Sequence, residues 1–145
     1  RGDQFVTRKI TKYIAELDHA LANGQPKPIL CLGNLHARRD WGHAKDYVQG
    51  MWLMLQQEHP DDYVLATGET HSVREFLLAA FEAAHLPFDE SLIKTTASLH
   101  RPCEVPFLKG DSSKARTKLG WKPKFTFQDL VNDMVYSDIG ALAGV

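Results

Sequence analysis

Apolar side chains recur every three or four residues over residues 4–23, 43–58 and 72–85, and again from residue 126. This spacing predicts four amphipathic helices. Ser72 and Glu75 match the capping-box pattern at the start of the third helix. A short further helix is expected between Asp111, which can cap its start, and Gly120, the residue type that commonly follows a helix end.

The apolar stripe of the 43–58 helix is wider than one core face requires. Its members are Ala44, Tyr47, Val48, Met51, Trp52 and Leu55, with Leu53 and Met54 beside them. We therefore expect this helix to be buried on two sides, with its back face covered by a further part of the protein.

Two short apolar runs predict strands. The first is 29–32, which is closed by a Gly-Asn pair, and the second is 63–67, which is followed by Gly68. The polar connection 38–42 can include one extended stretch, and residues 86–100 give no clear signal. Alternating strands and helices favour α/β packing. The strands are too few and too short for a complete doubly wound sheet, so the chain is predicted to be part of a larger α/β protein.

Composition and charge exclude several classes of protein. The 145 residues suit one domain, and 43% hydrophobic with 24% charged residues is typical of a folded globular protein. A formal net charge of −1 predicts no general affinity for nucleic acid or anionic membranes. No apolar run is long enough to span a bilayer and no signal-peptide pattern is present, so we expect a cytoplasmic protein. Because the chain opens with Arg1 rather than Met, we expect that an upstream segment has been removed.

The charges are segregated along the chain. Residues 58–90 hold eight acidic side chains against one arginine, a net −7, whereas residues 101–124 hold seven basic against two acidic side chains, a net +5. Such a pattern indicates either a local anion site or, more commonly, solvated helix faces.

No metal site is predicted. Cys31 and Cys103 are the only cysteines, they form no CxxC pair, and the seven histidines form no HxxxH or His-Cys cluster.

The strongest local motif is the run from Arg38 to His43, RRDWGH, placed between a short strand and a helix start. A guanidinium there can clamp a diphosphate through two parallel hydrogen bonds, and backbone N–H groups of the helix start would add to an anion site. The structural alternative is a surface arginine pair with Asp40 as its ion-pair partner.

Two other positions can bind an anionic ligand. Pro102 restricts Arg101 to an extended conformation, and Glu104 can accept hydrogen bonds from a ribose, although a plain loop explains this stretch equally well. Lys9 or Arg8, in the first turns of the first helix, can reach a phosphate or a base edge, or can simply be solvated. Trp41, like the other two tryptophans, is interpreted as a core or edge-of-core anchor and not as a base-stacking platform.

Several catalytic motifs are absent from the sequence. It has no GxGxxG, GxxGxxG, GxxxxGK[ST] or GxSxG, and none of its four tyrosines has a lysine four residues on. No catalytic residue is therefore assigned, and this chain by itself has no evident means of moving a hydride.

Taken together, these segments resemble the GDP-mannose 4,6-dehydratases, a family of extended short-chain dehydrogenase/reductases. The resemblance is collinear over nearly the whole chain, and its most specific motif is RDWGHAKDY at 39–47. The other matching stretches are 1–2, 5–10, 32–35, 51–56, 66–76, 101–102, 104–105, 110–111 and 119–123. The resemblance implies that residues 1–145 are a nucleotide-sugar-binding domain, mainly helical with a few short strands. This domain would pack on a Rossmann domain outside this chain.

The resemblance also implies a reaction. Family members convert GDP-mannose to GDP-4-keto-6-deoxymannose on the route to GDP-fucose, with NADP taking a hydride from C4 and returning it to C6. The Thr, Glu, Tyr and Lys that perform this chemistry in the family would lie upstream of Arg1, so this chain alone is expected to be inactive. The full-length protein is expected to be a homodimer or homotetramer.

By the same resemblance, Arg1 matches a residue at the NADP end and Lys9 one at the GDP part. Arg39 and Arg101 match diphosphate clamps, and Glu104 matches a carboxylate near the ribose. Departures are His100 where the family has an aromatic residue, Cys103 where it has a small or hydroxylated one, and a weak match over 86–100. Two alternatives stay open, a non-catalytic GDP-sugar-binding module and a part of a related GDP-sugar reductase.

Overall fold

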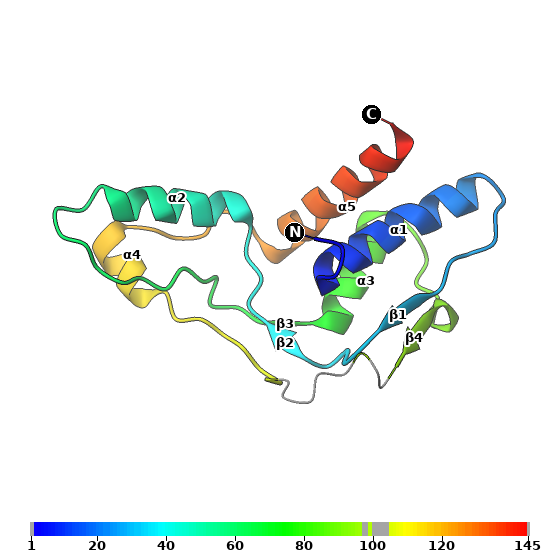
Figure 1. The fold of residues 1–145 in the computed structure, drawn as a ribbon, viewed down its shortest axis with the longest axis horizontal. Helices are drawn as coiled ribbons and strands as arrows, with labels where there is room; N and C mark the ends of the chain where they lie inside the picture. The colour runs from blue at the N-terminus through cyan, green and yellow to red at the C-terminus, as the bar shows by residue number, and fades with distance from the viewer. Residues whose placement is uncertain (1, 97–98, 100–104, 145) are drawn as a thin grey trace. The chain divides into compact units, whose positions relative to one another are not determined.

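The computed structural model describes residues 2–96, Leu99 and residues 105–144 (Figure 1). The chain divides into two compact units. The first combines Arg1–Ala37, Ser72–Pro106 and Val131–Val145, and the second combines Arg38–His71 and Phe107–Leu130.

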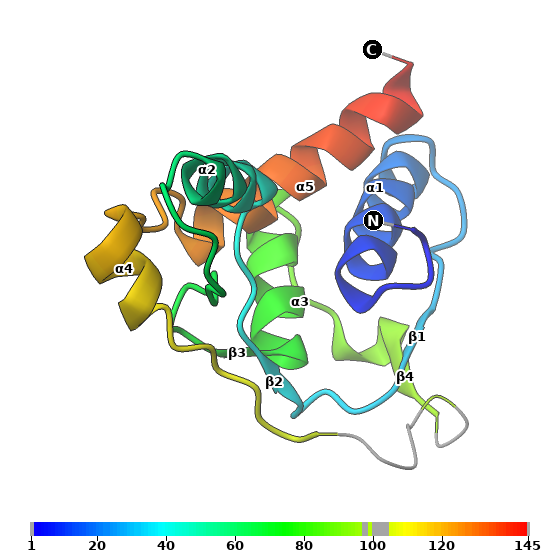
Figure 2. The same cartoon turned by 60° about the vertical axis from the view of Figure 1, so that its left-hand side comes forward.

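The first unit is built around two packed helices, α1 (Val6–Ala22) and α3 (Val73–Ala83). They lie side by side in both views (Figures 1 and 2). The predicted spacing is realised, because the buried face of α1 includes Ile10, Ile14 and Leu17. The facing part of the core comes from α3, whose buried large side chains are Phe76, Leu77 and Phe81.

A buried ion pair fastens the last helix of the chain to α1. This helix, α5 (Phe127–Ala143), spans the boundary of the two units and belongs to the first from Val131 onward. The Asp138 carboxylate is buried, pairs with the Arg8 guanidinium and accepts a hydrogen bond from the Thr11 hydroxyl at 2.6 Å. Burying a charge is unfavourable unless it is paired and hydrogen-bonded, and both conditions are met here.

The capping box predicted at the start of α3 is present. The Ser72 hydroxyl accepts from the Glu75 N–H at 3.0 Å, while the Glu75 carboxylate accepts from the Ser72 N–H at 2.7 Å. At the start of α5, Thr126 and Asp129 make the same reciprocal pair of bonds. The short helix is α4 (Ser113–Leu119), and its N-cap is Ser112 and not Asp111 as expected, although the Asp111 carboxylate accepts from the Ser113 N–H at 2.8 Å. It ends at Gly120 with φ +63°, as predicted.

One strand of the first unit was missed by the sequence reasoning. The expected strand is β1 (Leu30–Leu32), and it pairs in parallel with β4 (Ile93–Thr95), Leu30 opposite Ile93. A 3₁₀ turn, η1 (Glu90–Leu92), precedes β4. A three-residue strand is too short to show a period, so the 86–100 region gave no signal.

The second unit is organised around Trp121, which is almost completely buried. Its elements are β2 (Arg38–Arg39), α2 (Ala44–Leu55), α4, and β3 (His71–Ser72) up to His71. Ala115 and Leu119 of α4 pack with Trp121, and partly buried side chains surround them: Tyr47, Leu53, Met54, Tyr63 and Leu65.

One face of α2 is packed as expected, and the covering of its back face by a further part of the protein stays a prediction. Among the described residues, the packed side carries Tyr47, Gly50, Leu53 and Met54. Four members of the predicted stripe are exposed instead: Val48 (63%), Met51 (57%), Trp52 (59%) and Leu55 (82%). The wide stripe therefore consists of a packed face and an exposed apolar face.

The predicted strand at 63–67 is not part of a sheet in the described residues. Its side chains keep the alternation of a strand, since Tyr63 and Leu65 pack on the Trp121 cluster while Val64 is exposed. A strand needs a hydrogen-bonding neighbour, and β2 pairs with β3 instead. The prediction of a buried strand at 63–67 was therefore wrong, because Val64 is exposed and the segment joins no sheet in the described residues.

The overall expectation is confirmed. The chain is mainly helical, its strands form two small two-stranded sheets, and the described residues contain no complete Rossmann sheet. Over the same residues, none of the helices combines the length and apolar character needed to cross a bilayer.

Replacing Gly50 by alanine is expected to destabilise the second unit. An added Cβ would meet Leu65 Cδ1 at 2.6 Å and Trp121 Nε1 at 3.0 Å. Helix propensity alone would make Gly50→Ala stabilising by up to ~1 kcal/mol, whereas overpacking costs roughly 1–3 kcal/mol. Urea unfolding followed by tryptophan fluorescence should show the loss. Met51→Ala, at an exposed position one residue on, is the control and should change little; a Gly50→Ala chain more stable than wild type would contradict this packing.

Candidate functional site

The candidate site begins on β2, which carries Arg38 and Arg39. This strand is held by its pairing with β3 and by the Leu108 N–H, which donates to the Arg38 carbonyl at 3.1 Å. The Arg38 guanidinium donates to the Thr70 carbonyl at 2.6 Å and to the Thr70 hydroxyl at 3.2 Å. The Arg39 guanidinium donates to the Arg38 carbonyl at 2.8 Å, and its side chain is partly buried. Arg38 therefore helps to fix the loop after residue 66, and Arg39 extends from a backbone that is fixed on both sides.

The Asp40 carboxylate joins three segments of the second unit. It accepts from the Thr67 N–H at 2.9 Å, the Thr67 hydroxyl at 2.6 Å, the Gly68 N–H at 2.9 Å and the Gly110 N–H at 3.2 Å. Burial by itself would raise the pKa of Asp40, and the hydrogen bonds from Thr67, Gly68 and Gly110 outweigh it, so the pKa is lowered. Asp40 is thus a structural tie, not the ion-pair partner that the sequence alternative proposed.

The next residues of the motif start α2. A side chain on Gly42 would collide with the Tyr47 hydroxyl, so glycine is required there. His43 is the N-cap, with its Nδ1 accepting from the Lys45 N–H at 3.2 Å. Its ring stacks on Phe125 at 4.3 Å between centroids.

Asp46, in the first turn of α2, is almost fully buried and binds the backbone of the segment that follows α4. Its carboxylate accepts from the Lys124 N–H at 3.0 Å and the Phe125 N–H at 3.1 Å. Its carbonyl accepts from Trp121 Nε1 at 2.8 Å. The motif at 39–47 therefore consists largely of residues that hold this unit together.

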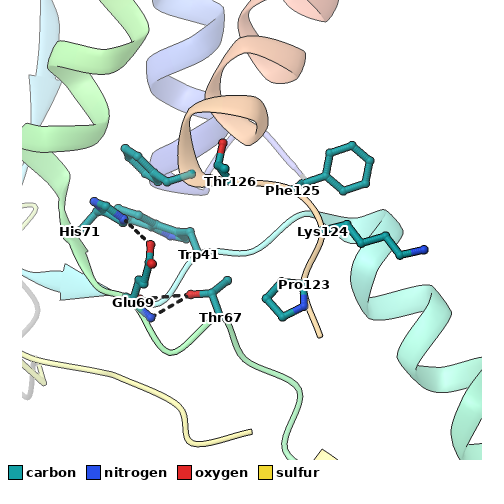
Figure 3. A pocket seen from close by; sticks show the side chains of 9 residues that line it. Trp41, Thr67, Glu69, His71, Pro123, Lys124, Phe125 and Thr126 are labelled. Atoms are coloured by element: carbon teal, nitrogen blue, oxygen red, sulfur yellow. Dashed lines mark hydrogen bonds and ion pairs between the residues drawn. The ribbon is translucent and has the colours of Figure 1, made fainter. Parts of the chain in front are cut away.

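A pocket of about 190 Å³ opens beside Trp41. Its lining comes from Trp41, Thr67, Glu69, His71 and residues 123–127, all of the second unit. Figure 3 shows Trp41, His71 and Glu69 on one side and the chain from Pro123 to Phe125 opposite. The His71 ring stacks on Phe127 at 3.7 Å between centroids, and Trp41 lies nearly parallel to the same ring at 6.3 Å. We call this cavity the Trp41 pocket.

The structure distinguishes between the two basic residues of the first helix. Arg8 is committed to the ion pair with Asp138, so it is occupied within the first unit. Lys9 is partly buried on α1, and no acidic side chain of the described chain pairs with it. Lys9 is thus the better candidate for an anionic ligand.

Three of the predicted binding residues, Arg1, Arg101 and Glu104, lie outside the described residues. The meeting of Arg39 and Arg101 around one pyrophosphate therefore stays a prediction. In the part of the chain that is described, no group of three or more potential ligands could hold a metal ion.

Part of the charge segregation is explained by internal pairing. Asp61 accepts from Lys114 at 2.6 Å and from Lys118 at 3.2 Å, which joins the loop after α2 to α4. The hydrogen bond from Lys114 is the main cause that lowers the pKa of Asp61 to about 2, helped by the Asp62 N–H and by Lys118. Arg116 donates to the Thr67 carbonyl at 3.2 Å. The basic segment is therefore used in part within the unit.

Sequence reasoning missed two features here, the role of Asp40 and the Trp41 pocket. Asp40 sits 27 and 70 residues from the groups it binds, so no local pattern could reveal the connection. Trp41 was interpreted as a core or edge-of-core anchor, and its partial burial agrees with the edge of a core, but the cavity that it lines was not foreseen. The position of Trp41 between a strand and a helix start was the one available signal. Trp52, which was given the same interpretation, is exposed instead.

The family model described as GDP-mannose 4,6 dehydratase matches residues 1–134. Among curated proteins, GDP-mannose 4,6 dehydratase 1 of Arabidopsis thaliana is 51% identical over 139 residues, which cover 96% of this chain and 37% of the relative. The GDP-mannose 4,6 dehydratase of Drosophila melanogaster is 46% identical over 155 residues, with 96% and 38% covered. The chain thus spans about two-fifths of the length of the curated relatives it matches.

Solved structures show the same fold. RMD from Pseudomonas aeruginosa, solved with NADPH, matches with a TM-score of 0.82 at 18% identity over 97% of this chain and 44% of its own. The dTDP-glucose 4,6-dehydratase of Bacillus anthracis, solved with NAD, matches with a TM-score of 0.67 at 16% identity, with 86% and 37% covered. The fold is therefore that of a part of an extended short-chain dehydrogenase/reductase.

Replacing Asp40 by asparagine should loosen the second unit, because an amide offers one acceptor oxygen where four donors converge. We expect a loss of about 1–2 kcal/mol in the free energy of unfolding at pH 7. Since the pKa of Asp40 is lowered in the folded state, its contribution is present above the ordinary value of 3.8 and is lost as the pH falls through the folded value.

The difference between wild type and Asp40→Asn should therefore shrink in urea unfolding below pH 3.8. Asp62→Asn, on an exposed aspartate of the same unit, is the matched control and should differ little from wild type at either pH. An Asp40→Asn chain with wild-type stability at pH 7 would show that the four hydrogen bonds do not hold the unit together.

Proposed function

Since the chain belongs to the GDP-mannose 4,6-dehydratase family, we propose that it is the part of such an enzyme that binds GDP-mannose. The observation that carries the proposal is the fixed backbone around Arg39. β2 pairs with β3, and its Arg38 carbonyl accepts from the Leu108 N–H. Asp40, the residue after Arg39, is held by its hydrogen bond from the Thr67 N–H. A guanidinium on a rigid element loses less conformational freedom on binding than one on a loop, and its planar fork matches two oxygens of a diphosphate.

Each binding residue has a separate role in this proposal. Arg39 clamps the pyrophosphate, and Lys9 supplies a second positive charge to the GDP part. Arg101 and Glu104 complete the set, as a second clamp and an acceptor for the ribose, and Arg1 contacts the cofactor end. Support for Lys9 comes from the contrast with Arg8, whose charge Asp138 already neutralises.

The full-length enzyme would convert GDP-mannose to GDP-4-keto-6-deoxymannose, with NADP accepting and returning the hydride when bound. The described residues do not fit a dinucleotide cradle, because β1 leads through residues 33–37 to another strand and not through a glycine-rich turn into a helix. Apart from the contact of Arg1 with the cofactor end, the roles given to this chain therefore concern the sugar nucleotide. We also place the full-length enzyme in the cytoplasm as a homodimer or homotetramer.

A second candidate function is a GDP-sugar-binding module without catalysis. It is favoured by the absence of a Tyr–Lys pair from the sequence. Turnover of GDP-mannose with NADP separates the two: this chain alone should show none, and a longer chain that includes the upstream part should show it only if the first proposal is right.

We further propose that the exposed face of α2 packs on the part of the enzyme outside this chain. On this helix a continuous apolar strip consists of Val48, Met51, Trp52 and Leu55. Val64, in the 63–67 segment that pairs with no strand of the described residues, is exposed as well. An apolar face together with an unpaired strand pattern is what the edge of an incomplete α/β layer presents.

Arg39→Ala should weaken binding of GDP by about 1.5–3 kcal/mol, the usual range for hydrogen bonds to a charged group. Arg39→Lys should recover only part of this loss, because an ammonium cannot make the bidentate contact. Isothermal titration calorimetry of the 145-residue chain measures both. Lys122→Ala removes the same charge from an exposed position and should leave the affinity unchanged. Equal affinity of wild type and Arg39→Ala would reject the clamp.

The exposed face of α2 should bind a hydrophobic fluorescent dye in the isolated chain. The double substitution Met51→Gln with Trp52→Gln should remove most of the fluorescence gain, because it makes the centre of the strip polar. Leu21→Gln, on an exposed leucine of α1, is the control and should keep the signal. A monomeric wild-type chain that leaves the dye dark would count against a docking face on α2.

A further inference from the structure

The Trp41 pocket has a chemical character that the proposed function does not use. It lies entirely within the second unit and is lined by Trp41, His71 and Phe127 together with the Glu69 carboxylate and the Thr67 and Thr126 side chains. At about 190 Å³ it exceeds what a single water needs but falls below the ~300–1,000 Å³ typical of a pocket for a whole drug-sized ligand. It suits one functional group of a ligand and not a complete nucleotide.

The lining carries one carboxylate, that of Glu69, and one ammonium group, that of Lys124. Figure 3 shows the Glu69 carboxylate directed toward Trp41 and His71, with its Oε2 3.9 Å from His71 Nε2. The Asp40 carboxylate lies next to Thr67 and accepts a hydrogen bond from its hydroxyl at 2.6 Å. A second negative charge therefore stands next to this wall.

Basic groups near the pocket are directed elsewhere. Lys124 belongs to the lining, but its side chain extends away from the other lining residues in Figure 3. Arg116 reaches the Thr67 carbonyl, yet its guanidinium lines a different, neighbouring cavity with Gly68 and residues 109–113. Among the described residues that line it, the Trp41 pocket thus combines aromatic rings with the Glu69 carboxylate, and its lysine, Lys124, extends away from the others.

Aromatic faces and carboxylates attract the same kind of ligand. The ring quadrupole places negative charge on the faces of tryptophan and phenylalanine, and tryptophan is the best of the side chains for binding a cation. A carboxylate beside the ring adds charge-assisted hydrogen bonds to any N–H of that cation. An apolar group would contact the aromatic rings but would give the carboxylate no hydrogen bond. An anionic group would be repelled by the carboxylate.

We propose that the Trp41 pocket binds a small organic cation through its guanidinium or primary ammonium group, with Glu69 as the hydrogen-bond acceptor and Trp41 as the aromatic wall. Neither Arg39 nor Lys9 is among the lining residues of this pocket, and the binding proposed here needs no GDP. Because the Glu69 side chain is 73% exposed, the interaction is weakened by solvent, and we expect a dissociation constant on the order of 1–10 mM.

The test titrates the 145-residue chain with methylguanidinium chloride and, in parallel, with methylurea, which has a similar planar shape and no charge. Trp41 is followed by the chemical shift of its indole N–H, assigned by comparison with Trp41→Phe. We expect a saturable shift with methylguanidinium and none at the same concentrations of methylurea. An equal response to both, or no saturation up to about 50 mM methylguanidinium, would overturn the proposal.

Two matched variants localise the charge. Glu69→Gln keeps the shape of the side chain and should weaken methylguanidinium binding by up to about fivefold, the upper end of the range for an exposed charge pair. Glu58→Gln removes the same charge from an exposed position outside the lining and should leave binding unchanged. Equal weakening in both variants would mean that only net charge matters, and the site would be rejected.

A third arm identifies where the cation comes from. Free arginine and an acetylated, amidated tripeptide with a central arginine carry the same guanidinium. Tighter binding of the free amino acid assigns the pocket to a small-molecule ligand, and tighter binding of the tripeptide assigns it to an arginine side chain of another polypeptide. Failure of both to shift the Trp41 signal overturns the proposal, and none of these results bears on GDP binding at Arg39.

Discussion

The second unit depends on one carboxylate. Asp40 accepts four hydrogen bonds from groups that are 27, 28 and 70 residues away along the chain, three of them backbone N–H groups. Partly buried N–H groups need acceptors, and an ionised carboxylate offers several lone pairs in one place. Because Asp40 stands between Arg39 and Trp41, the same tie fixes the candidate phosphate clamp on one side and the wall of the Trp41 pocket on the other.

Two further carboxylates repeat this arrangement. Asp46 receives the backbone at 124–125 and so fixes the chain after Trp121, and Asp138 receives Arg8 and Thr11 in the first unit. Each of the three binds groups distant in sequence. Each therefore connects distant segments of the chain, as the hydrogen bonds of a larger sheet would. Such carboxylates help to explain how the described residues, whose sheets are two-stranded, form two packed units.

The motif that identifies the family is therefore mostly architectural. Within RDWGHAKDY, Asp40, Gly42, His43 and Asp46 are accounted for by the contacts that hold the second unit together. Arg39 is the member with a partly buried guanidinium on a fixed strand, and the proposal for the sugar nucleotide rests on it. A motif can be highly specific for a family because it specifies the scaffold of a site as well as the site itself.

The sequence by itself determined the helices, their caps, the mainly helical class and the family, because periodicity, capping pairs such as Ser72 with Glu75, and short motifs are properties of neighbouring residues. Only the tertiary structure decided which face of α2 is packed and that 63–67 pairs with no strand of the described residues. It also decided that Arg8 forms an ion pair with Asp138 and that Asp40 joins three segments of the second unit. Those features depend on groups brought together from distant parts of the chain, and no local spacing encodes which distant donor an acceptor will meet.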